Sequence, residues 1–142
     1  MGKDATYTVE IGSGFAEFWR YNIAVTCGMF GADDEQCGFV SAEDKVAPVG
    51  SNLSAAPKGT PSRRSVRFEA GDCHHLRMYV YLIPHSLPKA VRIADCKPFA
   101  LSIKVSYGGE TVLHEKRSIN QWSGASIEIV ASRPQNGESQ LP

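Results

Sequence analysis

The sequence predicts an all-β protein, an antiparallel β-sandwich of about seven to eight strands with at most one short helix. Two segments, Trp19–Met29 and Phe99–Tyr107, place apolar residues or Cys at every second position. This alternation is typical of a strand that buries one face. Breaker residues separate the apolar segments, as expected for the turns of a sandwich.

The strand segments follow one another along the chain. They are Tyr7–Ile11, Trp19–Met29, Val66–Ala70, Leu76–Ile83, Phe99–Tyr107 and Ile127–Ala131. In the second of these, the pattern points Trp19 and Tyr21 toward the core, and Arg20 and Asn22 away from it. Leu76–Ile83 is apolar or aromatic on both sides except at Arg77, which predicts a central strand covered on both faces.

The connections are predicted from composition. Ser41–Ser65 contains fourteen Ser, Ala, Pro or Gly in 25 residues, which predicts a long flexible loop. We expect one domain over residues 1–131 and a disordered tail over 132–142. Leu87–Asp95, with Ser86 as a candidate N-cap, fits a short helix or a strand.

The glycine pair Gly108–Gly109 predicts a two-residue hairpin turn. That turn places Val105 opposite Val112 and Ile103 opposite His114. We prefer this register because the alternative aims Glu115 at the core, and a charge costs more to bury than an imidazole. His114 is then expected to be mostly buried.

Composition excludes several classes of function. The chain has 142 residues, with 15 Lys and Arg against 15 Asp and Glu, so we expect no nucleic-acid partner. No run of apolar residues is long enough to span a membrane. The first ten residues contain no apolar signal core. We expect a cytoplasmic protein if Met1 is the native start, and a secreted or periplasmic one if a signal peptide was removed. Four cysteines fit either free thiols or two disulfides.

The segment "DCHH" at 72–75 is the main candidate for chemistry. Asp72, His74 and His75 are metal-ligand types, but adjacent histidines on a strand point to opposite faces, and no ligand-spacing motif accompanies them. We interpret the segment as a turn leading into the Leu76 strand, and we expect no cofactor. The acidic run at 32–36 lacks calcium-loop spacing and is interpreted as a hairpin tip.

No nucleophile motif or phosphate loop is present, so the sequence favours a non-catalytic protein over an enzyme. The main hypothesis is a binding or protein-interaction module that contacts a protein or glycan surface. Trp122 lies in a polar loop and is the candidate binding residue. One alternative is an enzyme or metal-dependent protein that uses Asp72–His75. Another is a structural subunit assembled through sheet edges. The oligomeric state stays open.

Overall fold

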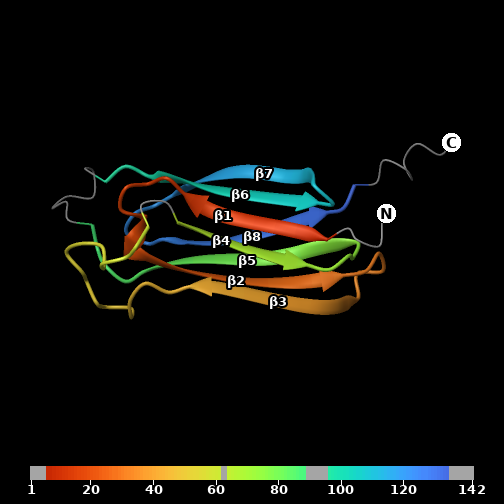
Figure 1. Cartoon of the computed structure of the whole chain (residues 1–142), viewed down its shortest axis with the longest axis horizontal. Helices are drawn as coiled ribbons and strands as arrows, with labels where there is room; N and C mark the ends of the chain where they lie inside the picture. Colours follow the sequence, from red (N-terminus) through yellow and green to blue (C-terminus); the bar gives the residue numbers. More distant parts are fainter. Residues whose placement is uncertain (1–5, 62–63, 89–95, 135–142) are drawn as a thin grey trace.

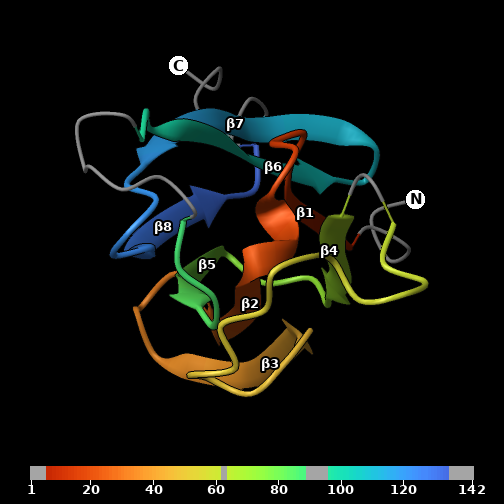
Figure 2. The same ribbon diagram turned by 90° about the vertical axis from the view of Figure 1, so that its left-hand side faces the viewer.

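The chain folds into the predicted sandwich of two antiparallel sheets (Figure 1). The computed structural model describes residues 6–61, 64–88 and 96–134. One sheet has the strand order β4-β1-β6-β7, and the other has the order β3-β2-β5-β8. Viewed along the strands, they form two layers (Figure 2). The strands are β1 (Tyr7–Ser13), β2 (Tyr21–Phe30), β3 (Gln36–Asp44), β4 (Arg64–Ala70), β5 (His75–Pro84), β6 (Phe99–Tyr107), β7 (Glu110–Ile119) and β8 (Ala125–Ser132).

Little of the described chain is helical. The only helical element within the described ranges is a 3-10 turn, η2 (Phe18–Arg20). Accordingly, none of these residues belongs to a helix long and apolar enough to cross a membrane. The predicted helix or strand at 87–95 lies mostly outside the described residues, which resume at Cys96.

The core lies between the sheets and follows the predicted alternation. Ile23, Val25, Leu101, Ile103 and Val105 are all buried, as expected. Each of these side chains extends from the inner face of its strand, because successive residues of a strand point to opposite faces.

The start of β2 differs from the prediction. The strand begins at Tyr21, after η2, and Trp19 is half-buried outside it. Arg20 and Asn22, which were expected to face outward, are buried. Asn22 accepts a hydrogen bond from the Val46 amide at 2.7 Å, so the segment after β3 folds over this end of β2.

The connection between β3 and β4 is shorter than predicted. Residues 41–44 belong to β3, while Arg64 and Ser65 belong to β4. The connection itself is anchored at its middle, because the Leu53 amide donates to Ser86 Oγ at 2.6 Å. Flexibility elsewhere in this loop stays a prediction. Ser132, the first residue of the expected tail, ends β8, and residues 135–142 lie outside the described part.

The β6–β7 hairpin has the predicted turn but a different register. Tyr107 pairs with Glu110, and both glycines have positive φ, 57° and 87°. A bulge at Val112 then shifts the pairing, so that Val105 faces Leu113 and Ile103 faces Glu115. The predicted pairing of Ile103 with His114 is therefore wrong, and His114 is exposed.

The bulge has a physical reason. It lets both Val112 and Leu113 pack against the core, whereas a regular strand would present only one of them. Glu115 avoids burial because β7 is an edge strand: the carboxylate stays half-exposed and accepts a hydrogen bond from Arg117 at 2.8 Å. Inward-pointing charges of this kind also protect an edge from pairing with another chain.

Candidate functional site

Residues 71–74 form the turn between β4 and β5, as predicted, but β5 begins one residue earlier than predicted, at His75. Asp72 is exposed and accepts hydrogen bonds from Tyr107 at 2.8 Å and Arg133 at 2.9 Å. The hydrogen bond to Asp72 raises the pKa of the Tyr107 hydroxyl. Asp72 thus joins the ends of β6 and β8, and it does not share a site with the two histidines.

His74 and His75 instead form a chain with Asp34. His75 Nε2 lies 3.0 Å from Asp34 Oδ1, and the Nδ1 atoms of the two imidazoles lie 2.9 Å apart. The carboxylate can only accept, so Nε2 carries the proton and donates it in a hydrogen bond, which leaves His75 Nδ1 as the acceptor of the neutral ring. His75 is buried and His74 half-buried.

The loop that carries Asp34 is held in a defined conformation. Asp34 connects β2 to β3 and has a positive φ of 66°, which non-glycine residues rarely adopt. The Asp34 amide donates to the Gly31 carbonyl at 2.9 Å, and the Gly31 amide donates to the Glu35 carbonyl at 2.9 Å. This tight hairpin tip matches the interpretation of the 32–36 segment and aims the carboxylate at His75.

The nearby thiols have the properties of core residues. Burial raises the pKa of the Cys27 thiol to about 12 and also raises the pKa of Cys73. A thiol is a poor nucleophile because the thiolate is the reactive form. The four cysteines are unpaired, which agrees with the free-thiol alternative. Within the described ranges, no group of three or more His, Cys, Asp or Glu could hold a metal ion.

The outer face of the β3-β2-β5-β8 sheet carries several exposed apolar side chains among polar ones. The prediction that β5 is covered on both faces is wrong here. Four side chains of this face are exposed: Phe39 (59%), Val130 (45%), Tyr79 (38%) and Ile83 (38%). The register places Gly28 between Phe39 and Arg77, and Thr26 opposite Tyr79. Because the residues of β2 on this face are small, the larger side chains of the neighbouring strands stay exposed to solvent.

Arg77 and Glu128, two of the charged groups on this face, are paired with each other. Arg77 lies 3.3 Å from Glu128, which also accepts from the Tyr79 hydroxyl at 3.3 Å. The Arg77 guanidinium covers the Phe30 ring at 5.6 Å, and that ring stacks on His75 at 5.4 Å. We call this surface, formed by Phe30, Phe39, Arg77, Tyr79, Ile83, Glu128 and Val130, the aromatic face.

The outer face of the β4-β1-β6-β7 sheet is more polar than the aromatic face. Its outward positions include Glu10 on β1 and Lys104 on β6, which are directly opposite one another. A hollow of about 330 Å³ on this face is lined by three serines, two glycines that include Gly12, and the charged residues Glu10, Arg64 and Lys104. A Cβ atom at Gly12 would meet the Arg64 carbonyl at 2.6 Å, so the glycine is explained by close strand approach.

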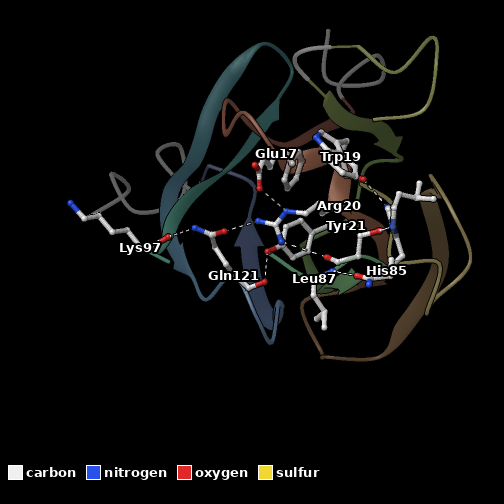
Figure 3. A network of polar contacts seen from close by, with 12 residues as sticks. Glu17, Trp19, Arg20, Tyr21, His85, Leu87, Lys97 and Gln121 are labelled. Carbon is white, nitrogen blue, oxygen red and sulfur yellow. Dashed lines mark hydrogen bonds and ion pairs between the residues drawn. The ribbon is translucent and has the colours of Figure 1, made fainter. Parts of the chain in front are cut away.

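A polar network centred on the buried Arg20 lies at the end of the sandwich away from the β4–β5 turn (Figure 3). Arg20 is 1% exposed and donates to Glu17 at 2.9 Å and to Gln121 at 2.6 Å. His85 Nε2 lies 2.7 Å from the Trp19 carbonyl, and Nδ1 lies 2.7 Å from Ser86 Oγ. A carbonyl can only accept, so Nε2 carries the proton and Nδ1 accepts from Ser86. All these groups are engaged with one another, which indicates a structural role.

His85 makes the stability of this end dependent on pH. Burial lowers the pKa of His85, so the unfolded chain, with a His pKa of about 6.5, binds the proton more readily than the folded one. We therefore expect neutral His85 to make its whole contribution to the free energy of unfolding above about pH 6.5. That free energy should fall as the pH drops below this value. Denaturant unfolding at neutral and mildly acidic pH should show a smaller acid loss in His85→Gln than in the unmodified chain. An equal loss in both would contradict this assignment.

Trp122 lies in the turn between β7 and β8. The Asn120 side chain caps the turn by accepting from the amides of Trp122 at 2.8 Å and Ser123 at 3.1 Å. The indole is half-buried, and its Nε1 is a buried atom that lacks a hydrogen-bond partner among the described residues. Trp122 lies away from the histidine chain, since it belongs to the end that holds Gln121. A binding role for it stays a prediction.

Comparisons with known proteins add little to these contacts. No protein-family model matches the sequence, and no curated protein matches it. The chain is similar to the crystal structure of a DUF4425 family protein from Bacteroides ovatus ATCC 8483. The TM-score is 0.36 and the identity 11%, over 89% of this chain and 90% of that one. A similarity this distant carries no argument about function.

Two features of the surface were not predicted from the sequence. Asp34 is 41 residues from His75, and only the β2–β3 hairpin brings the two together. The aromatic face was misassigned because a strand with apolar residues on both sides resembles a fully covered strand. The small residues at Ala24, Thr26 and Gly28 were the available signal, since they border the larger side chains without covering them.

Proposed function

We propose that this chain is a non-catalytic binding module whose aromatic face contacts a protein partner. The observation that supports the proposal is the exposure of Phe39, Tyr79 and Val130 on one outer face of a sandwich. A group of exposed apolar side chains on one face is a common mark of an interaction site.

The composition of the face favours a protein as the partner. Interface cores are enriched in aromatic residues and Arg and depleted in charge. Tyr79, Phe39 and Arg77 fit this pattern, and the guanidinium of Arg77 is held in place by Phe30 and Glu128. Side chains that are already fixed lose less entropy on binding.

The rigidity of the support also favours binding. The face is carried by four hydrogen-bonded strands, with β2 and β5 paired continuously from Tyr21–Pro84 to Phe30–His75. Buried, protonated thiols at Cys27 and Cys73 give no support to nucleophilic catalysis at the nearby end.

The test is site-specific photo-crosslinking in cells that express the chain. Benzoylphenylalanine at Phe39 should crosslink to a defined protein, whereas the same group at Lys104, on the polar sheet, should not. With the purified partner, Tyr79→Ala should weaken binding about tenfold or more, as expected for an interface aromatic. Lys104→Ala should leave the affinity unchanged.

Two outcomes would contradict the proposal. Crosslinks of equal yield from both faces would show that the aromatic face is not selective. Binding to an oligosaccharide that depends on Tyr79 would replace the protein partner with a glycan.

A further inference from the structure

We propose that the outer edge of β3 binds an extended, basic segment of the partner protein by strand addition. This inference deepens the proposed function and rests on it, because β3 carries Phe39 of the aromatic face. β3 is an end strand of its sheet and lies at the margin of the sandwich (Figure 1). An end strand presents backbone N–H and C=O groups that can pair with another chain.

The direction of these backbone groups follows from hydrogen bonds at the two ends of β2. The Arg20 carbonyl accepts from the His85 amide at 2.9 Å, so the even-numbered residues of β2 are hydrogen-bonded to β5. The Gly31 amide donates to the Glu35 carbonyl at 2.9 Å, so the odd-numbered residues of β2 are hydrogen-bonded to β3. The two sides of β2 therefore alternate regularly along the strand.

The register then identifies the outward groups of β3. The residues of β3 that lie opposite odd-numbered residues of β2 are Gly38, Val40, Ala42 and Asp44. The residues between them, Phe39, Ser41 and Glu43, therefore turn their backbone N–H and C=O groups away from the sheet. The side chains of these three residues are also exposed. A strand added here lies beside Phe39 and continues the aromatic face.

The charge of this edge favours a basic segment. Residues 31–44 contain five acidic residues and no Lys or Arg. Glu35 and Glu43 are exposed toward opposite ends of β3, and Lys45, the exposed residue after the strand, offsets only part of this charge. A second copy of β3 fits less well, because it brings the same acidic residues and like charges across an interface cost affinity.

The other end strands are less suited to a basic segment. β7 is interrupted by the bulge at Val112 and points Glu115 inward, which protects its edge. β4 carries two arginines against one glutamate. β8 has a single charged residue, Glu128, which is bound by Arg77.

Hydrogen exchange tests the direction of the backbone groups. In the free chain, the amides of Phe39, Ser41 and Glu43 should exchange faster than those of Val40 and Ala42, which donate to β2. Saturation with a binding peptide should slow the first three amides and leave the other two unchanged. Slow exchange of the first three amides in the free chain would contradict an open edge.

The probe is the acetylated peptide amide Lys-Thr-Val-Thr-Val-Thr-Thr-Lys. In the antiparallel orientation its lysines lie near Glu43 and Glu35, and its valines lie opposite Ser41 and Phe39. Calorimetric titration under reducing conditions should give one peptide per chain. Replacing both lysines with glutamate should raise the Kd about tenfold or more, because attraction then becomes repulsion.

Two methylated peptides test the backbone pairing without changing the protein. In this orientation the N–H groups of both valines donate to β3, so N-methylation of the valines should abolish binding. The N–H groups of the first two threonines point away from β3, so N-methylation there should change the Kd by no more than about threefold.

Two proline variants provide the matched test in the protein. Ser41→Pro removes an outward N–H that β2 does not use, and proline is tolerated at such edge positions. The Arg133 amide donates to the His74 carbonyl at 3.2 Å, so Ser126 on β8 also turns its N–H outward, at the other edge of the sheet. Ser41→Pro should raise the Kd of the peptide about tenfold or more, and Ser126→Pro should leave it within about twofold.

Several results would overturn strand addition at β3. They are no binding of the lysine peptide, equal affinity for the two methylated peptides, and equal effects of the two proline variants. Self-association of the free chain that Ser41→Pro abolishes would replace the partner segment with a second copy.

The result also separates this inference from the proposed function. A protein that crosslinks from Phe39 and depends on Tyr79, but binds Ser41→Pro normally, would keep the proposed function and overturn strand addition. Peptide binding at β3 without any protein crosslinked from Phe39 would support the edge site and contradict the proposed function.

Discussion

Replacing Arg20 with alanine is expected to lower the free energy of unfolding by about 3 kcal/mol, toward the lower end of the cost of breaking a buried ion pair, since Glu17 is partly exposed. The guanidinium binds Glu17, Gln121 and the Ser86 carbonyl at one closed end of the sandwich. Its loss leaves the buried Ser86 carbonyl and the partly buried acceptors of Glu17 and Gln121 without this donor, and it removes contacts with the Tyr21 ring, 5.3 Å away.

Two further variants make the measurement specific. Arg67→Ala, at an exposed position on β4, should change the free energy of unfolding by no more than about 0.5 kcal/mol. Arg20→Lys should lie between the two, because an ammonium keeps the charge but loses the planar fork of donors. If urea unfolding gave equal losses for Arg20→Ala and Arg67→Ala, the network would contribute no stability.

Replacing Ile103 with alanine is expected to cost about 2–5 kcal/mol, from lost burial plus the cavity that remains. Ile103 lies in the centre of the core with no exposed surface, and β6 is flanked by β1 and β7. A central site of this kind has little freedom to collapse around a smaller side chain.

The neighbouring residue provides the control. Lys104 lies on the outer face of the same strand, and Lys104→Ala should stay within about 0.5 kcal/mol. Thermal or denaturant unfolding that ranked Lys104→Ala as the more damaging change would contradict the assignment of the two faces of β6.

The candidate sites show where sequence reasoning ends. The interpretation of the 72–75 segment as a turn was correct for residues 72–74, which follow Gly71, whereas His75 already belongs to β5. The partners of this segment were not predictable, since Asp34 reaches His75 through a hairpin and Arg133 reaches Asp72 from the end of β8. Such contacts are set by strand order, which local patterns do not encode.

The register of the β6–β7 hairpin shows a second limit. The glycine pair correctly predicted the turn, but the bulge at Val112 depends on whether one or two apolar side chains can reach the core. The cost assigned to Glu115 was also too high, because an edge strand leaves its carboxylate half in water. The burial of a charge thus depends on the position of its strand in the sheet.

The sequence by itself determined the all-β class, the inner faces of β2 and β6 and the turn at Gly108–Gly109, because each depends on the alternation or backbone freedom of nearby residues. The tertiary structure alone decided that Arg20 is buried and that the outer face of β5 is exposed. The physical reason is the same in both cases: burial depends on what packs against a residue, and those neighbours come from distant parts of the chain.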